Sequence, residues 1–168
     1  MSLSSRSRRA WLLAGVGGVG GLLAGCNFRL RQPPQLRFER LALAGFAPRS
    51  PMEAELRRQL GAAVRVVDTP GEAQLVLQVL DDVRERSVVA STAAAQVREL
   101  QLRVKFNFRA STPAGRELIP RVELLQSRDL SYRETAALAK ESEEAELFRE
   151  MQVDVAEQVL RRLASVQI

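Results

Sequence analysis

Apolar and polar residues alternate most strictly between residues 97 and 110, which predicts a β-strand with one buried and one open face. Looser alternation predicts two further strands over residues 73–89 and 117–130. Because short loops favour antiparallel neighbours, we expect the three segments to form a meander. The apolar side of the middle strand consists of Leu100, Leu102, Val104, Phe106 and Phe108.

A helix is predicted to begin at Ser50, whose hydroxyl can cap the first turn. Pro51 suits the first helical position, and Glu53 has the spacing of a capping box. Gly61 offers a stop near the end of the helix. Apolar residues recur at helical spacing in this segment and predict one buried side, made of Met52, Leu56, Leu60 and Ala63.

Three more segments complete the predicted fold. Residues 36–43 and 64–67 read as short strands, and residues 131–165 read as a long C-terminal helix with an apolar stripe. This order of elements predicts an α+β domain over residues 36–168, with a single four- to five-stranded, mostly antiparallel sheet and two helices packed on one face.

The N-terminal segment has a different composition. Three arginines among the first nine residues precede 14 uncharged residues, 10–23, and Leu23-Ala24-Gly25 then precedes Cys26, the only cysteine. This is the layout of a secretory signal peptide, and the stretch is shorter than the roughly 20 apolar residues that span a bilayer. The last four residues resemble a bacterial lipobox, which implies cleavage before Cys26 and acylation of its sulfur and new amino group.

The chain is therefore divided into a cleaved signal, 1–25, a lipid-anchored tether, 26–35, and the α+β domain. Arg8-Arg9 also resembles part of a twin-arginine signal, so the general secretory and twin-arginine export routes both stay open. A G-x-G-x-x-G string at residues 15–20 lies inside the predicted signal rather than between a strand and a helix, so it predicts no dinucleotide site. The covalent lipid on Cys26 is the only bound group we expect.

Without the signal, the charge of the chain is nearly balanced. Residues 26–168 hold 22 basic and 20 acidic residues, which removes the main argument for a nucleic-acid partner. The chain has no histidine, so neither a Cys/His metal site nor a Ser-His-Asp triad can be built, and a single cysteine allows no internal disulfide. We expect no metal, no catalytic residues and no enzyme activity.

Cations on the polar side of the middle strand are the candidate binding residues. Arg103, Lys105 and Arg109 share that side, Arg98 lies near the strand's start, and Arg121 on the next strand can join them. A solvated sheet face is the simpler interpretation, because alternation alone produces such faces. The alternative is that helices cover the apolar side and leave these cations free to bind phosphate groups. Arg84 and Arg86 are weaker candidates.

Several ordered stretches resemble the LptE (RlpB) family of lipopolysaccharide-assembly lipoproteins. Residues 25–31, Gly-Cys-Asn-Phe-Arg-Leu-Arg, are similar to the family's opening, although Asn27 stands where glycine is usual. Residues 94–102 resemble the start of its central strand, with Ala95 where glycine is frequent. Residues 128–132, followed by 139–141 and 143–147, resemble its strand-to-helix junction, and residues 151–163 resemble its last helix.

The resemblance implies a lipoprotein at the periplasmic face of the outer membrane, where Asn27 is not the aspartate associated with inner-membrane retention. It implies that the domain plugs an LptD-type β-barrel, helps the barrel assemble and contributes to lipopolysaccharide transport. It also implies that some basic residues bind lipopolysaccharide, for which Arg98, Arg103, Lys105, Arg109 and Arg121 are the candidates. A stand-alone periplasmic lipid carrier or transport-accessory lipoprotein is the alternative.

Overall fold

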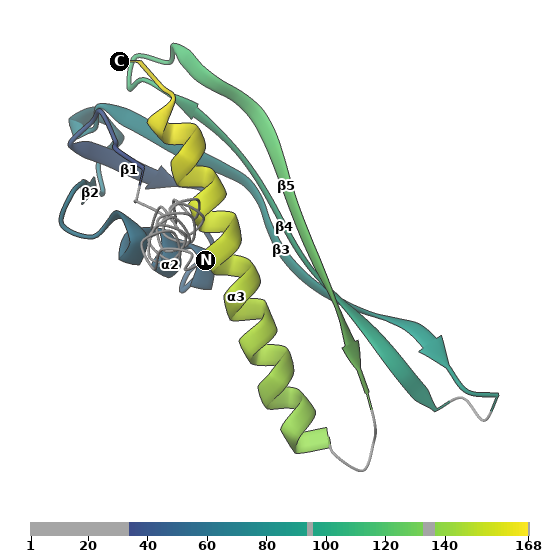
Figure 1. The fold of residues 1–168 in the computed structure, drawn as a ribbon. Helices are drawn as coiled ribbons and strands as arrows, with labels where there is room; N and C mark the ends of the chain where they lie inside the picture. Colours follow the sequence, from purple (N-terminus) through teal and green to yellow (C-terminus); the bar gives the residue numbers. More distant parts are fainter. Residues whose placement is uncertain (1–33, 94–95, 133–136, 168) are drawn as a thin grey trace, which may run out of the picture. The chain divides into compact units, whose positions relative to one another are not determined.

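A computed structural model describes residues 34–93, 96–132 and 137–167, which belong to the unit Pro34–Ile168. Its five strands form one sheet in the order β2-β1-β3-β4-β5 (Figure 1). The elements are, in chain order, β1 (Arg40–Ala44), α2 (Pro51–Leu60), β2 (Arg65–Val67), the short 3₁₀ helix η2 (Pro70–Glu72), β3 (Leu75–Ser91), β4 (Val97–Ser111), β5 (Glu117–Ser131) and α3 (Ala137–Ala164).

The sheet is mixed, with its antiparallel part much the larger. β1 pairs in parallel with both β2 and β3, through only a few residues in each case. The long strands β3, β4 and β5 form the expected antiparallel meander. The prediction of an α+β domain with a mostly antiparallel sheet of four to five strands and two helices is therefore confirmed.

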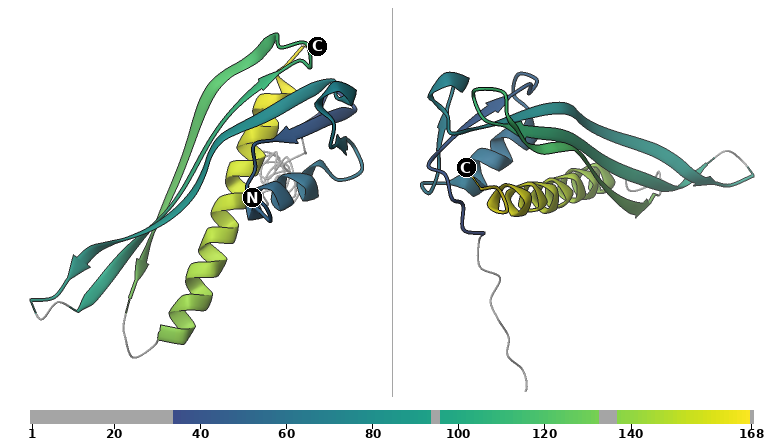
Figure 2. Two further views of the ribbon diagram at one scale, coloured as in Figure 1. Left: turned by 180° about the vertical axis from the view of Figure 1, so that it is seen from behind. Right: turned by 90° about the horizontal axis from the view of Figure 1, so that it is seen from above.

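Both helices pack on the same face of the sheet (Figure 2). The apolar residues of β4 point into this layer, and Leu102, Val104 and Phe106 are fully buried there. Met52 of α2 and Met151 of α3 meet them from the helix side and are equally inaccessible. One continuous hydrophobic core thus fills the space between sheet and helices, and the opposite sheet face carries no helix among the described elements.

The helix α2 begins as its sequence predicts. The backbone nitrogen of Glu53 donates to the Ser50 hydroxyl at 3.2 Å, and Pro51 occupies the first helical position. The hydroxyl of Ser50 also donates to Oδ2 of Asp82 on β3 at 2.7 Å. The cap therefore fixes the start of the helix and ties it to the sheet.

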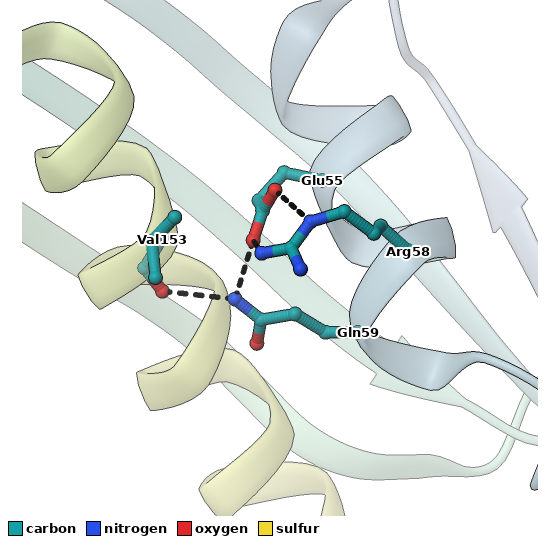
Figure 3. Close-up of polar contacts among 4 residues, drawn as sticks. All are labelled: Glu55, Arg58, Gln59 and Val153. Carbon is teal, nitrogen blue, oxygen red and sulfur yellow. Dashed lines mark hydrogen bonds and ion pairs between the residues drawn. The ribbon is translucent and has the colours of Figure 1, made fainter. Parts of the chain in front are cut away.

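A polar contact holds α2 against α3 (Figure 3). Nε2 of Gln59 donates to Oε1 of Glu55 at 2.7 Å and to the backbone oxygen of Val153 at 3.2 Å. Burial would raise the pKa of Glu55, but hydrogen bonds from Arg58 and Gln59, together with the charge of Arg58, outweigh it and lower that pKa. Glu55 in turn raises the pKa of Arg58.

A bulge in β3 marks a change in that strand. The register with β4 shifts between Val79 and Asp81, and beyond the shift most β3 residues are exposed. Gly45 lies against this bulge with φ +85°, and a Cβ built on it would come within 2.5 Å of the Val79 oxygen. Only glycine fits this close approach without a shift of the backbone.

Two expected boundaries are wrong. The first strand begins at Arg40 rather than Leu36, because Oε1 of Gln74 accepts from the backbone nitrogens of Glu39 and Arg40 where pairing would otherwise start. The last helix begins at Ala137 rather than Ser131. Ser131 still belongs to β5, where it lies opposite Glu99 of β4. Within the described part of the chain, no helix is long and apolar enough to cross a membrane.

Candidate binding face of the sheet

The face of β3, β4 and β5 that points away from the helices, called the open face below, carries three of the candidate cations. From Glu99 to Ser111, β4 has no bulge of its own, so Arg103, Lys105 and Arg109 alternate with the buried residues and share this face. Residues directly opposite them on β3 and β5 share it too, because paired strand positions point the same way. The open face is thus organised in rows that run across three strands.

One row combines a cation with exposed apolar side chains. Lys105 lies opposite Val83 of β3 and Leu125 of β5. Leu125 is 59% exposed and Val83 is 37% exposed. An ammonium flanked by two exposed hydrophobic side chains offers both kinds of contact that an anionic amphiphile needs. Nζ of Lys105 is 4.0 Å from Oε2 of Glu123, the limit of an ion pair, so this contact holds the lysine only weakly.

Arg103 and Arg109 of β4 contact neutral side chains. Nε of Arg103 donates to Oε1 of Gln101 at 2.7 Å. Arg109 donates through Nε and Nη2 to Oε1 of Gln78 on β3, at 2.9 and 2.6 Å. Both guanidinium groups keep further donors for another acceptor, because each carries five N–H groups.

Arg121 joins the open face from β5. Its Nη2 lies 3.6 Å from Oδ2 of Asp81 on β3, so this ion pair reaches across β4. Asp81 also accepts from Nδ2 of Asn107, the fully buried residue of β4 that lies opposite it. Oδ1 of Asn107 is buried and has no hydrogen-bond partner in the described part of the protein. In this row Asp81 links Arg121 by an ion pair and Asn107 by a hydrogen bond, so Arg121 is not a free cation.

Arg98 lies at an irregularity of β4. The register with β3 shifts from Ala90–Glu99 to Ser91–Val97, so Arg98 has no partner on β3, and its side chain is exposed near the strand's start. The regular alternation of β4 therefore groups four of the five candidate cations on the open face and does not include Arg98. Arg84 and Arg86 point to the helix side, where Arg84 lies over the ring of Phe148.

The open face has no net positive charge along these rows. Its four cations are offset by acids at paired positions, which include Asp81, Glu85, Glu99, Glu123 and Asp129. A balanced face attracts an anion by local contacts and not by a long-range field. The row around Lys105 is the place where such a contact has apolar support.

Sequence reasoning missed Val83 and Leu125 as neighbours of Lys105. Leu124 and Leu125 are adjacent in β5, so one of them must point away from the core, and Leu124 is the buried one. The two adjacent leucines were the sequence signal that could have revealed an apolar side chain on the open face.

Cys26 and the tether up to residue 33 lie outside the described residues. Among the described residues no group of three or more histidine, cysteine, aspartate or glutamate side chains is placed to hold a metal.

The fold resembles solved lipoprotein structures. An uncharacterized lipoprotein B from Nitrosomonas europaea is 27% identical, covers 83% of this chain and 91% of its own, and superposes with a TM-score of 0.68. The rare lipoprotein B from Shewanella oneidensis is 25% identical, covers 76% of this chain and 95% of its own, and gives a TM-score of 0.63. The described domain is therefore of the α+β class found in these bacterial lipoproteins.

The family model LptE, described as lipopolysaccharide-assembly, matches residues 38–163. A Yersinia enterocolitica protein named LPS-assembly lipoprotein LptE is 30% identical, over 96% of this chain and 78% of its own length. A protein of the same name from Photorhabdus laumondii is 29% identical, over 96% of this chain and 88% of its own. The chain belongs to the LptE family, and the resemblance noted in its sequence is confirmed.

Proposed function

We propose that this LptE-family protein is anchored by acylated Cys26 at the periplasmic face of the outer membrane. There its domain occupies the lumen of an LptD-type β-barrel, helps the barrel assemble and contributes to lipopolysaccharide transport. The signal layout before Cys26 and the family match over residues 38–163 support this proposal. A diacylglycerol on the sulfur and an acyl chain on the nitrogen exceed the single chain that gives only marginal membrane binding.

The open face is the surface that we propose for contact with lipopolysaccharide. The main support for a lipopolysaccharide contact is the row in which Lys105 lies between exposed Val83 and Leu125. A lipid A phosphate can accept from the ammonium, while the two apolar side chains contact the adjoining acyl chains. Arg103, Arg109 and Arg121 supply further donors on the same face, and Arg98 lies exposed at the irregular start of β4.

A stand-alone lipid carrier needs an apolar cavity for lipid tails. The cleft between α2, β3 and α3 has a volume of about 1180 Å³, but nine charged side chains line it. Burying acyl chains against so many charges is unfavourable. This cleft therefore gives the carrier alternative no support, and we propose a structural and binding subunit without enzyme activity.

Purification of the tagged full-length protein from detergent-extracted outer membranes tests the barrel partnership. We expect an LptD-type β-barrel to copurify with it in near-equal amounts. The variant Cys26→Ser keeps the domain but removes the acylated sulfur, so it should reach the barrel less efficiently. Recovery of the pure protein without any large β-barrel partner would contradict the proposal.

A further inference from the structure

A second polar site lies on the side of the sheet that the helices cover. The cleft of about 1180 Å³ is walled by α2 and α3, and its floor is the part of β3 that follows the bulge. Asp82, Arg84 and Arg86 of β3 line it, together with Phe148 and Gln152 of α3. Of the residues that carry the proposed lipopolysaccharide contact, Val83 alone also lines this cleft.

Gln152 is the unusual residue of the cleft. Its side chain lines the cleft although the residue is only 6% exposed. Nε2 of Gln152 is buried and has no hydrogen-bond partner among the described residues. A buried donor without a hydrogen-bond acceptor destabilises the folded state. The simplest explanation for the amide of Gln152 is an acceptor supplied by a bound ligand.

Arg84 supplies a second donor to the same cleft. Its guanidinium carbon lies 5.8 Å from the ring centre of Phe148, one helical turn from Gln152 on α3. The other arginines of the lining have carboxylate partners. Arg86 is 3.2 Å from Glu144, Arg58 pairs with Glu55, and Arg149 pairs with Glu146.

The cleft is long enough for a short extended peptide. Gln152 and Glu141 both line it and lie 11 positions apart on α3, which corresponds to about 16 Å of helix. An extended peptide covers that distance with about five residues. The walls are held together by Gln59 of α2, which donates to the backbone oxygen of Val153 on α3 (Figure 3).

We infer that this cleft binds an extended peptide segment of a partner protein. A carboxamide has the same donor and acceptor as a peptide group, so Gln152 can pair with a main-chain carbonyl of the segment. Arg84 can donate to an acceptor side chain at the end of the segment that lies near Gln152. Glu141 can pair with a basic side chain at the opposite end of the segment. With five acids and four arginines in the lining, a free anion gains no net attraction, and a lipid tail would lie against charged side chains beside the apolar ones.

Photocrosslinking of the full-length protein in cells identifies the occupant. Ala145 lines the cleft and is exposed, so the variant Ala145→p-benzoylphenylalanine places a photoreactive group there. Glu150→p-benzoylphenylalanine, at an exposed position of α3 outside the cleft, is the control. We expect the first variant to crosslink to one continuous segment of one polypeptide, located by mass spectrometry, and the control not to crosslink to that segment. Crosslinks to lipid, or to no polypeptide, would overturn the inference.

A synthetic peptide of the mapped segment then tests the role of Gln152. Its affinity for the full-length protein, read by fluorescence anisotropy, should fall about three- to tenfold in Gln152→Leu. Gln158→Leu makes the same change on α3 outside the cleft and should leave the affinity unchanged. The melting temperature of Gln152→Leu should not fall, because leucine removes the unpaired donor. Unchanged affinity in Gln152→Leu, or loss of its folded state, would contradict a binding role.

Discussion

The two halves of β3 show how one strand serves two purposes. Before the bulge, Leu75, Leu77 and Val79 are buried against the core. Beyond it, no residue from Val83 to Val89 is buried, and Val88 and Val89 are 56% and 48% exposed near the tip of the hairpin. The paired ends of β3 and β4 extend away from α3 in both views (Figure 2). The half of β3 before the bulge, called the covered half below, contributes to the core of the domain. The half beyond the bulge, called the uncovered half, leaves its side chains accessible to a partner.

The difference implies that stability and partner recognition can be separated by mutation. Free energy of folding comes mainly from apolar area removed from water, which the covered half supplies. The uncovered half, whose side chains are exposed, gains little free energy in this way. We therefore attribute to it a role other than stabilising the fold. The open-face row at Lys105 and the cleft beside Arg84 are the two surfaces that this half provides.

The largest expected effect is Phe106→Ala. Phe106 is fully buried and stacks on Phe46 at a ring-centre distance of 6.1 Å, so truncation leaves a large cavity. We expect a loss of about 3–5 kcal/mol in the free energy of unfolding, measured by urea denaturation. Val88→Ala in the uncovered half should cost less than about 1 kcal/mol. Equal losses at the two sites would remove the distinction between the buried core and the exposed end of the β3–β4 hairpin.

Gly45→Ala tests the junction between them. Alanine there meets a positive φ and the Val79 oxygen at 2.5 Å, so we expect a destabilisation of about 2–3 kcal/mol. Gly71→Ala is the matched control, since nothing lies within 4 Å of the added Cβ. Urea denaturation of both variants checks this, and a similar small change in both would show that the bulge does not depend on glycine.

Much of the covered half was predictable from local sequence. The alternation over β4 gave its buried face, and Ser50-Pro51 gave the start of α2, because both depend on residues close in the chain. Which residues lie opposite one another is a different matter, since Val83 and Leu125 meet Lys105 only through pairing of distant segments. The start of α3 was wrong for the same reason, because pairing of Ser131 with Glu99 extends β5.

Arg86→Gln removes an ion pair between the uncovered half and α3. Nη1 of Arg86 is 3.2 Å from Glu144, but the arginine side chain is 57% exposed, so we expect a loss of no more than about 0.5 kcal/mol. Amide hydrogen exchange should nevertheless speed up in the distal parts of β3 and β4, and not in β1. Unchanged exchange in both regions would show that this contact does not hold the hairpin.

The smallest effect concerns Glu55 of α2. Its folded-state pKa lies below the ordinary 4.5, so its contribution to stability is present above that pH and is lost as the pH falls through the lower folded value. Glu55→Gln should therefore flatten the acid limb of the stability curve, followed by urea denaturation between neutral and acidic pH. Glu150→Gln is the control and should leave that limb as it is.

Lipopolysaccharide binding by Lys105→Ala tests the central claim most directly. The chain has two lysines, so Lys140→Ala on α3 is a matched control for the loss of one ammonium. With the full-length protein, we predict that Lys105→Ala weakens binding about tenfold, that Lys140→Ala leaves it unchanged, and that both retain the urea midpoint of the unsubstituted protein. Undiminished binding in Lys105→Ala would contradict the account, because the open-face row at Lys105 would then have no part in lipopolysaccharide binding.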